Sequence, residues 1–206
     1  MTIATTKKLT FEEYLNLCET SQERYELVRG ELHLMTPPAW LHFLIADRLV
    51  TAFKQEIAQN DRPWIVVQGA GLQTMNDTSR LPDIAIVPFD AISDCLDRTA
   101  ILTVAAILVV EIASDSTALQ DYREKVTEYQ NRGIQEYWIA DPDPFGAAKY
   151  IGSPKRPTVS VYSLVNGGYQ VNRFRDRERI ISPTFPGLQL TAAQILWKDD
   201  EVKRNC

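Results

Sequence analysis

The chain has 206 residues and a formal net charge of −5, with 45% hydrophobic and 24% charged residues. This length and composition are typical of one soluble domain with a full core, and they exclude wholesale disorder. The acidic balance excludes a protein that coats nucleic acid through dense Lys and Arg clusters, but it is compatible with a nuclease whose carboxylates bind divalent cations.

Neither a membrane span nor a secretory leader is expected. No apolar stretch reaches the roughly 18 residues that a membrane-spanning helix needs, and the first eight residues lack the apolar core of a signal peptide. The three cysteines, Cys18, Cys95 and Cys206, are widely spaced and form no CxxC pattern. Incidental thiols of this kind favour a cytoplasmic location.

The first third of the chain predicts a helix, a hairpin and a second, longer helix. Thr10 and Glu13 form a capping box at the start of a helix over 9–17. Residues 24–35 indicate a β-hairpin that turns at its Arg-Gly pair, and two prolines end it. A long amphipathic helix is expected over about 39–59. Its apolar stripe consists of Leu41, Ile45, Leu49, Ala52 and Phe53.

Strands are expected in the middle of the chain. Residues 64–67 form one strand, and a loop containing Gly and Asp leads to a second strand that begins at Pro82-Asp83. The longest apolar run, 101–110, predicts a strand that is buried on both faces, as in the middle of a sheet. Glu111 closes this run.

The second half predicts a helix over about 118–132, which Gly133 ends, and a short buried strand over 136–140. Strands joined at the turn sequence 166–168 follow between about 149 and 174. The order of helices and strands is typical of an α/β layer arrangement.

Asp83 and Glu111 lie at the ends of strands that follow each other in the chain. A carboxylate there is costly unless it is paired, protonated or bound to a cation, and α/β proteins commonly place their chemistry at strand ends. If the two strands are neighbours, they lie roughly 5 Å apart, and their carboxylates could converge on one Mg²⁺ or Mn²⁺. Alternatively, Asp83 caps its strand and Glu111 pairs with a core arginine.

Lys125 flanks the inward stripe of Tyr122 and Tyr129 without filling the core, and it could reach the Glu111 strand end. An ammonium close to a scissile phosphate can orient the nucleophile and stabilise developing charge. The alternative is a solvated lysine that is paired with Asp121.

Two histidines and two glutamates have open roles. His42 falls on the buried stripe of the long helix, where it is either a core residue or a ligand. Glu26 and Glu31 flank the hairpin turn and either approach the site or form a solvated face. His33, in the same hairpin, is expected to be exposed.

Four arginines alternate near the end of the chain. An extended strand would place them on one face, where they could bind successive phosphates of a nucleic acid. The acidic residues between them are equally compatible with an ordinary charged edge strand. The arginines are Arg173, Arg175, Arg177 and Arg179.

An ordered series of motifs resembles the Uma-type restriction endonucleases, a family long catalogued as a domain of unknown function. The motifs are Tyr25-Glu-Leu-Val-Arg-Gly-Glu31, Pro82-Asp83, Val110-Glu-Ile-Ala-Ser-Asp-Ser-Thr117, Asp121-x-x-x-Lys125-x-x-x-Tyr129 and Gly133-Ile-Gln-Glu-Tyr-Trp-Ile-Ala-Asp-Pro142. The resemblance runs from about residue 11 to 190. It implies the restriction-endonuclease-like fold of the PD-(D/E)XK superfamily.

We therefore expect an α/β fold with a restriction-endonuclease-like core, a central mixed sheet flanked by helices, and N-terminal and C-terminal β-hairpins. Residues 1–206 would form a single domain, with a nuclease-like core over about 24–142 and a β-rich extension over about 149–190.

Carried over residue by residue, the resemblance implies that Asp83 and Glu111 ligate Mg²⁺ or Mn²⁺, with His42 as a further ligand. The superfamily pattern has a lysine two residues after the glutamate, where this chain has Ala113. The resemblance implies that Lys125, on the following helix, replaces it. Two further residues are expected to support the site, and these are Glu31 and Tyr129.

The expected function is metal-dependent hydrolysis of phosphodiester bonds in DNA, with no membrane partner and with a homodimer as a compatible assembly. Two alternatives stay open. One is a catalytically degenerate module of the same fold that binds nucleic acid or supports assembly. The other is a hydrolase of another class that uses Asp83 and Glu111 as a general acid and base, in the manner of a glycosidase.

Overall fold

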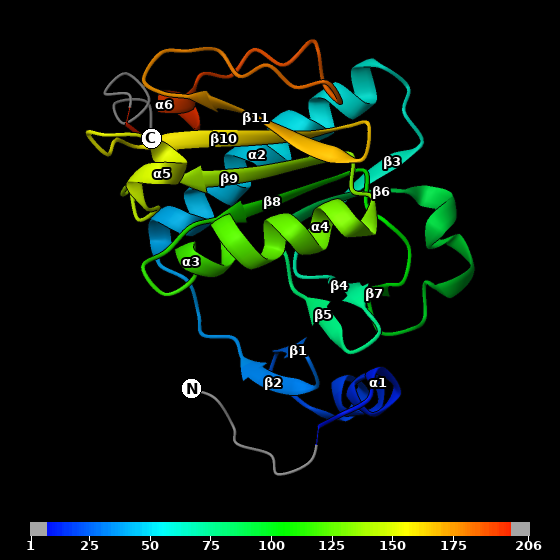
Figure 1. The fold of residues 1–206 in the computed structure, drawn as a ribbon. Coiled ribbons are helices and arrows are strands. Elements are labelled where there is room, and N and C mark those ends of the chain that lie inside the picture. The colour runs from blue at the N-terminus through cyan, green and yellow to red at the C-terminus, as the bar shows by residue number, and fades with distance from the viewer. Residues whose placement is uncertain (1–7, 199–206) are drawn as a thin grey trace.

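The computed structural model describes residues 8–198, and the strands of this part of the chain form two sheets with helices around them (Figure 1). The larger sheet has six strands in the order β11-β10-β9-β8-β6-β3, and the smaller has five in the order β2-β1-β5-β4-β7. In Figure 1 the larger sheet lies above the smaller one, with α2 behind it and α4 in front. The predicted α/β fold with a mixed sheet and flanking helices is confirmed.

The larger sheet contains one parallel pair of neighbours, β8 and β9, and its other neighbours are antiparallel. A parallel pair needs a crossover connection, and helical residues 118–132 supply it. The strands are β3 (Trp64–Val67), β6 (Ile84–Pro88), β8 (Leu108–Ile112), β9 (Glu136–Asp141), β10 (Thr158–Val165) and β11 (Gly168–Phe174).

The crossover is not a uniform α-helix. It consists of α3 (Ala118–Gln120), a π-helical turn (Asp121–Lys125) and α4 (Val126–Arg132). Gly133 ends it with a φ of 84°, in the left-handed region that the sequence predicts for this position. The sequence did not predict the π-helical turn, a feature that is frequent at functional sites.

Both faces of the larger sheet are covered. On one face, Val110 and Trp138 pack in a core with residues of α2 and α6. On the other face, Val109 and Tyr137 pack in a second core with residues of the crossover. β8 is therefore buried on both faces, as its apolar sequence predicts. The short helices outside the crossover are α5 (Ala148–Ile151), α6 (Ala192–Ile195) and two 3-10 turns, Phe89–Ala91 and Ser93–Cys95.

The elements predicted at the start of the chain are confirmed. The Thr10 side chain and Glu13 form the capping box of α1 (Phe11–Thr20). The hairpin comprises β1 (Tyr25–Val28) and β2 (Glu31–Leu34), and α2 covers Trp40–Gln59.

The prediction of one continuous strand over 101–110 is wrong. Ile101–Leu102 form β7 in the smaller sheet, whereas β8 begins only at Leu108 in the larger one. The run is continuous in hydrophobicity because both strands contribute to one core, which contains Leu102, Ala106 and Val109, although Val104 within the run is exposed. A hydrophobic run alone cannot show such a change of sheet.

The loop expected between β3 and Pro82 is also wrong in part. It contains a hairpin of β4 (Gly71–Met75) and β5 (Thr78–Arg80), which belongs to the smaller sheet. The polar residues of β5 gave no strand signal, although Thr78, Ser79 and Arg80 are all fully buried.

The arginine-bearing strand predicted over 173–179 ends at Phe174. The chain leaves the sheet there, and Asp176 adopts a φ of 49°, which interrupts an extended strand. Arg175 turns inward, where it donates to the carbonyl of Ile151 and to Thr158 Oγ1. The four arginines therefore do not line one face of a single strand.

Within residues 8–198, no helix is both long enough and apolar enough to cross a bilayer. Cys18 and Cys95 are free thiols, and Cys206 lies outside the described residues.

Candidate active site

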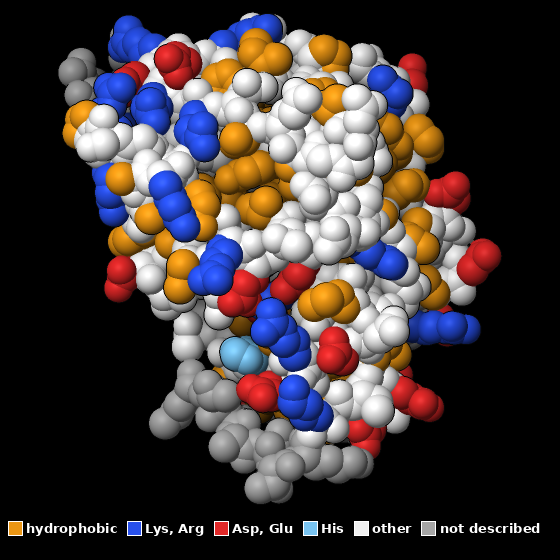
Figure 2. Space-filling model, viewed as in Figure 1, with side chains coloured by type: hydrophobic (Ala, Val, Ile, Leu, Met, Phe, Trp, Pro, Cys, Tyr) orange, Lys and Arg blue, Asp and Glu red, His pale blue; other side chains and the backbone are white. Residues whose placement is uncertain are grey.

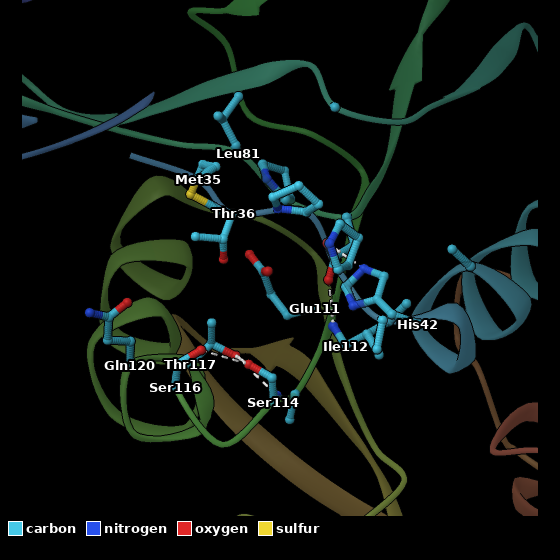
Figure 3. Close-up of a pocket in the computed structure, with 18 of the residues that line it drawn as sticks. Met35, Thr36, His42, Leu81, Glu111, Ile112, Ser114, Ser116, Thr117 and Gln120 are labelled. Atoms are coloured by element: carbon cyan, nitrogen blue, oxygen red, sulfur yellow. Dashed lines mark hydrogen bonds and ion pairs between the residues drawn. The ribbon is translucent and has the colours of Figure 1, made fainter. Parts of the chain in front are cut away.

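A cleft of about 710 Å³ opens where the β1–β2 hairpin faces the ends of β6 and β8. Its lining includes Glu26, His42, Asp83, Glu111 and Lys125. Figure 3 shows Glu111 between two groups of side chains, with Met35, Thr36 and Leu81 on one side and Ser114 and Thr117 on the other. The structure thus brings the sequence-predicted carboxylates, the lysine and a histidine into one cavity.

Asp83 lies where the ladder between β6 and β8 stops. The register of this pair ends at Ile84 and Val110, and Pro82 has no N–H to continue it. Asp83 Oδ2 accepts a hydrogen bond from the Ile112 N–H at 2.7 Å, so the side chain satisfies a donor that the backbone leaves unpaired. Oδ1 lies 2.9 Å from Nε2 of His42.

Glu111 is in β8, the strand adjacent to β6, and the residue is only 4% exposed. Tyr129 donates a hydrogen bond from its hydroxyl to Oε1 at 2.6 Å, and Nζ of Lys125 lies 2.9 Å from Oε2. Burial, together with the neighbouring carboxylates of Asp121 and Asp83, raises the pKa of Glu111 well above its usual value, although Lys125 opposes this shift. The charge of this carboxylate is therefore costly even with Lys125 beside it, and a further cation would offset that cost.

Lys125 is buried, and this corrects the expectation that it flanks the core without filling it. The π-helical turn directs Nζ to 3.0 Å from Asp121 Oδ1 and 3.9 Å from Glu26 Oε1, in addition to its contact with Glu111. Burial alone would lower the pKa of Lys125, but Asp121, Glu111 and Glu26 raise it well above the ordinary value. The amine is therefore an ammonium, and three carboxylates surround it.

Asp121 adds a further buried charge. Its Oδ2 is buried without a hydrogen-bond partner among the described residues. Burial raises the pKa of Asp121, while Lys125 opposes the shift. No role in the site is predicted for Asp121 from the sequence, although it begins one of the family motifs, and its i, i+4 spacing to Lys125 is the signal that could have assigned it there.

Arg80 and Glu26 form a second layer, in which Glu26 approaches the site as one of the two sequence-based alternatives has it, whereas Arg80 is not predicted from the sequence. Arg80 is fully buried, and it contacts Glu26 at 3.1 Å and Glu128 at 2.6 Å. Glu26 Oε1 also accepts a hydrogen bond from the Leu81 N–H at 3.0 Å. Burial raises the pKa of Glu26, but the nearby charges of Lys125 and Arg80 together lower it by more, so the net shift is downward. Glu26 is therefore held ionised in the wall of the cleft, between Lys125 and Arg80.

Replacing Arg80 with methionine should destabilise the fold by about 3–5 kcal/mol, because it leaves buried carboxylates without their partner. Urea unfolding at neutral pH measures this loss. The exposed Arg98 provides the control, and Arg98→Met should change stability by less than about 0.5 kcal/mol. Equal stabilities for the two variants would show that the buried network contributes little.

Two residues of the hairpin lie elsewhere than expected. Glu31 is exposed at the turn end of β2 and is not among the residues that line the cleft. His33 pairs with Glu26 across the hairpin, is half-buried and lines the cleft, so the expectation that it is exposed is wrong. Glu31 shares their face, but it lies two residues closer to the turn and therefore beyond the cavity.

The donor set fits a divalent cation. Asp83 and Glu111 face one cavity, and the surrounding buried carboxylates outnumber the two buried cations, Lys125 and Arg80. Within the described part of the chain, no three His, Cys, Asp or Glu side chains are grouped as a complete metal site. Mg²⁺ needs no such cage, since it commonly binds one or two carboxylates and keeps several waters.

The family model described as "Putative restriction endonuclease", Uma2, matches residues 11–193. The chain belongs to this family. A solved structure that resembles it is the crystal structure of a putative nuclease belonging to DUF820 from Anabaena variabilis. That structure has a TM-score of 0.71 and 19% sequence identity, and the match covers 92% of this chain and 98% of the other. No curated protein matches.

Uma2 membership and the shared fold confirm the resemblance that the sequence motifs indicate. They support a nuclease of the restriction-endonuclease type, for which nucleic acid is the implied substrate.

Proposed function

We propose that this Uma2-family protein is a metal-dependent endonuclease that hydrolyses phosphodiester bonds of DNA. The observation that carries the proposal is the convergence of Asp83, Glu111 and Lys125 in one cleft. Lys125 Nζ lies 2.9 Å from Glu111 Oε2, although Lys125 belongs to the crossover and Glu111 to β8. This contact supports the idea that Lys125 replaces the lysine that the superfamily pattern has at Ala113.

Asp83 and Glu111 would hold Mg²⁺ or Mn²⁺, with His42 near enough to Asp83 to assist, and the metal would supply Lewis-acid activation of water and phosphate. The protein groups then have separate tasks. The Ile112 N–H and His42 fix the two oxygens of Asp83, and the Tyr129 hydroxyl fixes one oxygen of Glu111. Fixed ligands avoid reorganisation during the reaction.

Lys125 is proposed to orient the attacking water and to stabilise the negative charge that develops on the phosphoryl oxygens. It lines the cleft, and its raised pKa keeps it charged across the physiological range. Asp121 and Glu26 also contact the ammonium, at 3.0 Å and 3.9 Å, and these contacts limit its movement.

An assay of supercoiled plasmid and of labelled single-stranded and double-stranded DNA with Mg²⁺ or Mn²⁺ tests the proposal. Cleavage should depend on the metal and stop with chelator. Asp83→Asn should reduce turnover by about 100-fold or more, since it weakens a metal ligand and its contact with His42. The exposed Asp97 gives a matched control, and Asp97→Asn should retain full activity.

Two results would contradict the proposal. Cleavage that survives in Asp83→Asn would remove this carboxylate from the mechanism. A wild-type protein that binds metal but cleaves neither DNA nor RNA would instead favour a catalytically degenerate binding module.

A further inference from the structure

The charges of this acidic chain are strongly segregated. Residues 145–180 contain seven Lys or Arg and only two Asp or Glu, a formal charge of +5, so the remainder of the chain carries −10. In Figure 2 the Lys and Arg side chains gather at the upper left, over the region of α5 and the adjacent ends of β10 and β11, and a row of them continues toward the lower centre.

Contacts around α5 bring these basic residues together. The Lys149 ammonium lies 4.7 Å from the centre of the Tyr150 ring, and Arg173 donates a hydrogen bond to the Tyr150 carbonyl. Arg156 pairs with Asp176 at 3.1 Å. We use the term basic face for this set: Lys149, Lys155, Arg156, Arg173, Arg175 and Arg177.

The basic face is mostly available to a ligand. All of its members except the half-buried Arg175 are exposed. The ion pair of Arg156 with Asp176 is solvent-exposed on both sides, and such pairs contribute little. Segment 145–180 contains only one other acidic residue, Glu178. The face therefore keeps an excess of positive charge.

The basic face is joined to the cleft in two ways. Asp143 and Phe145 line the cleft. Lys149 follows Phe145 by four residues, so their Cα atoms are at most about 14 Å apart. In addition, the Tyr150 ring stacks on Tyr122 at 5.2 Å, and Tyr122 belongs to the π-helical turn that carries Lys125. Residues 143–150 thus connect the cleft with the basic face.

We infer that the basic face binds the phosphate backbone of the DNA that flanks the scissile bond. This inference rests on the proposed function. Lysine and arginine neutralise backbone phosphates independently of base sequence, and each strand of a duplex carries one phosphate per roughly 3.4 Å of helix axis. A DNA duplex with a phosphate in the cleft would therefore reach the basic face within about four base pairs.

The test compares two triple variants with the same change in net charge. Lys149→Gln/Lys155→Gln/Arg156→Gln removes charge from the basic face. Lys54→Gln/Arg62→Gln/Arg98→Gln removes it from exposed positions that do not line the cleft. Each is made in an Asp83→Asn background, and binding of a labelled 20-nucleotide DNA duplex is measured by fluorescence anisotropy between 50 and 300 mM KCl.

The basic-face variant should bind at least about tenfold more weakly at low salt, and the slope of log Kd against log salt should fall by about 2–3, or about 0.9 for each lost phosphate contact in duplex DNA. The control should keep most of the affinity and slope. Equal losses in both variants, or no loss in the basic-face variant, would overturn the inference.

A second measurement separates this inference from the proposed function. Bis(p-nitrophenyl) phosphate is too small to reach from the cleft to the basic face. With Asp83 intact, the basic-face variant should hydrolyse it at the wild-type rate while its KM for long DNA rises. A wild-type protein without diesterase activity would contradict the proposed function, yet the anisotropy comparison would still decide whether the basic face binds DNA.

Discussion

Lys125→Met is expected to reduce DNA cleavage by about two orders of magnitude or more and to destabilise the fold by about 3–5 kcal/mol. The loss of turnover follows from removing a charge that stabilises the transition state. The loss of stability follows because the side chain is buried among Glu26, Glu111 and Asp121, and removing one partner of a buried ionic cluster leaves uncompensated charge.

The destabilisation should depend on pH. Without the ammonium, the pKa values of Glu111 and Asp121, already raised by burial, should rise further in the folded protein. A carboxyl group whose folded pKa is raised favours the folded state at pH values below its unfolded pKa, and this contribution is lost as pH rises through the folded pKa. The stability gap between wild type and Lys125→Met should therefore be smaller at pH 5 than at pH 8, as measured by urea unfolding.

A second substitution distinguishes the electrostatic explanation from a packing defect. Asp121→Asn/Lys125→Met removes one carboxylate together with the ammonium, so it should recover part of the lost stability without recovering turnover. The exposed Lys54 supplies the control, and Lys54→Met should change neither quantity. A Lys125→Met protein with wild-type turnover would refute the catalytic role, and an unchanged stability at both pH values would refute the buried cluster.

Asp83, Glu111 and Lys125, which the sequence proposes together, do meet in one cleft, because strand ends and helix spacing are local properties. The apolar strand before Glu111 and the strand that begins at Ile84 could be recognised individually, and their pairing brings the two carboxylates together. Lys125 and Tyr129 are one helical turn apart, so both reach Glu111 once the crossover helix covers the sheet. The site therefore depends only on the pairing of β6 with β8 and on the crossover that packs against the sheet.

The second layer depends on contacts between distant segments, and for that reason the sequence does not show it. Arg80 meets Glu26 and Glu128, which are 54 and 48 residues away in the chain. No periodicity connects these positions. Arg80 also lies in β5, whose polar residues resemble a loop, and its burial becomes evident only when the smaller sheet is assembled.

The arrangement of the basic residues in the C-terminal region was predicted only in part, for a similar reason. Alternating arginines suggested one strand, but the chain leaves the sheet after Phe174. The basic face instead combines Lys149 and Arg156, which precede β10, with Arg173 at the end of β11. Residues from three segments form this surface, and the antiparallel pairing of β10 and β11 is what places them together.

Glu111→Gln is expected to abolish the stabilisation of the protein by Mn²⁺ and to leave the metal-free protein as stable as the wild type or more so. A cation that binds only the folded state stabilises it by about 2.7 kcal/mol at 100 times its Kd, which appears as a rise in melting temperature. Glutamine keeps the shape of the side chain but removes most of its affinity for the metal.

The effect on the metal-free protein follows from the raised pKa of Glu111, which burial causes first and Asp121 and Asp83 increase. Its charge therefore opposes folding, increasingly so as pH rises through the raised folded pKa. Neutral glutamine removes that cost, while Lys125 keeps Asp121 and Glu26 as partners. The stability advantage of the variant should thus grow between pH 5 and pH 8.

Glu31→Gln, at an exposed position of β2 outside the cleft, should retain the full Mn²⁺ shift. If Glu111→Gln retains that shift as well, Glu111 is not a metal ligand, and the role of the cleft must rest on Asp83 and Lys125 instead.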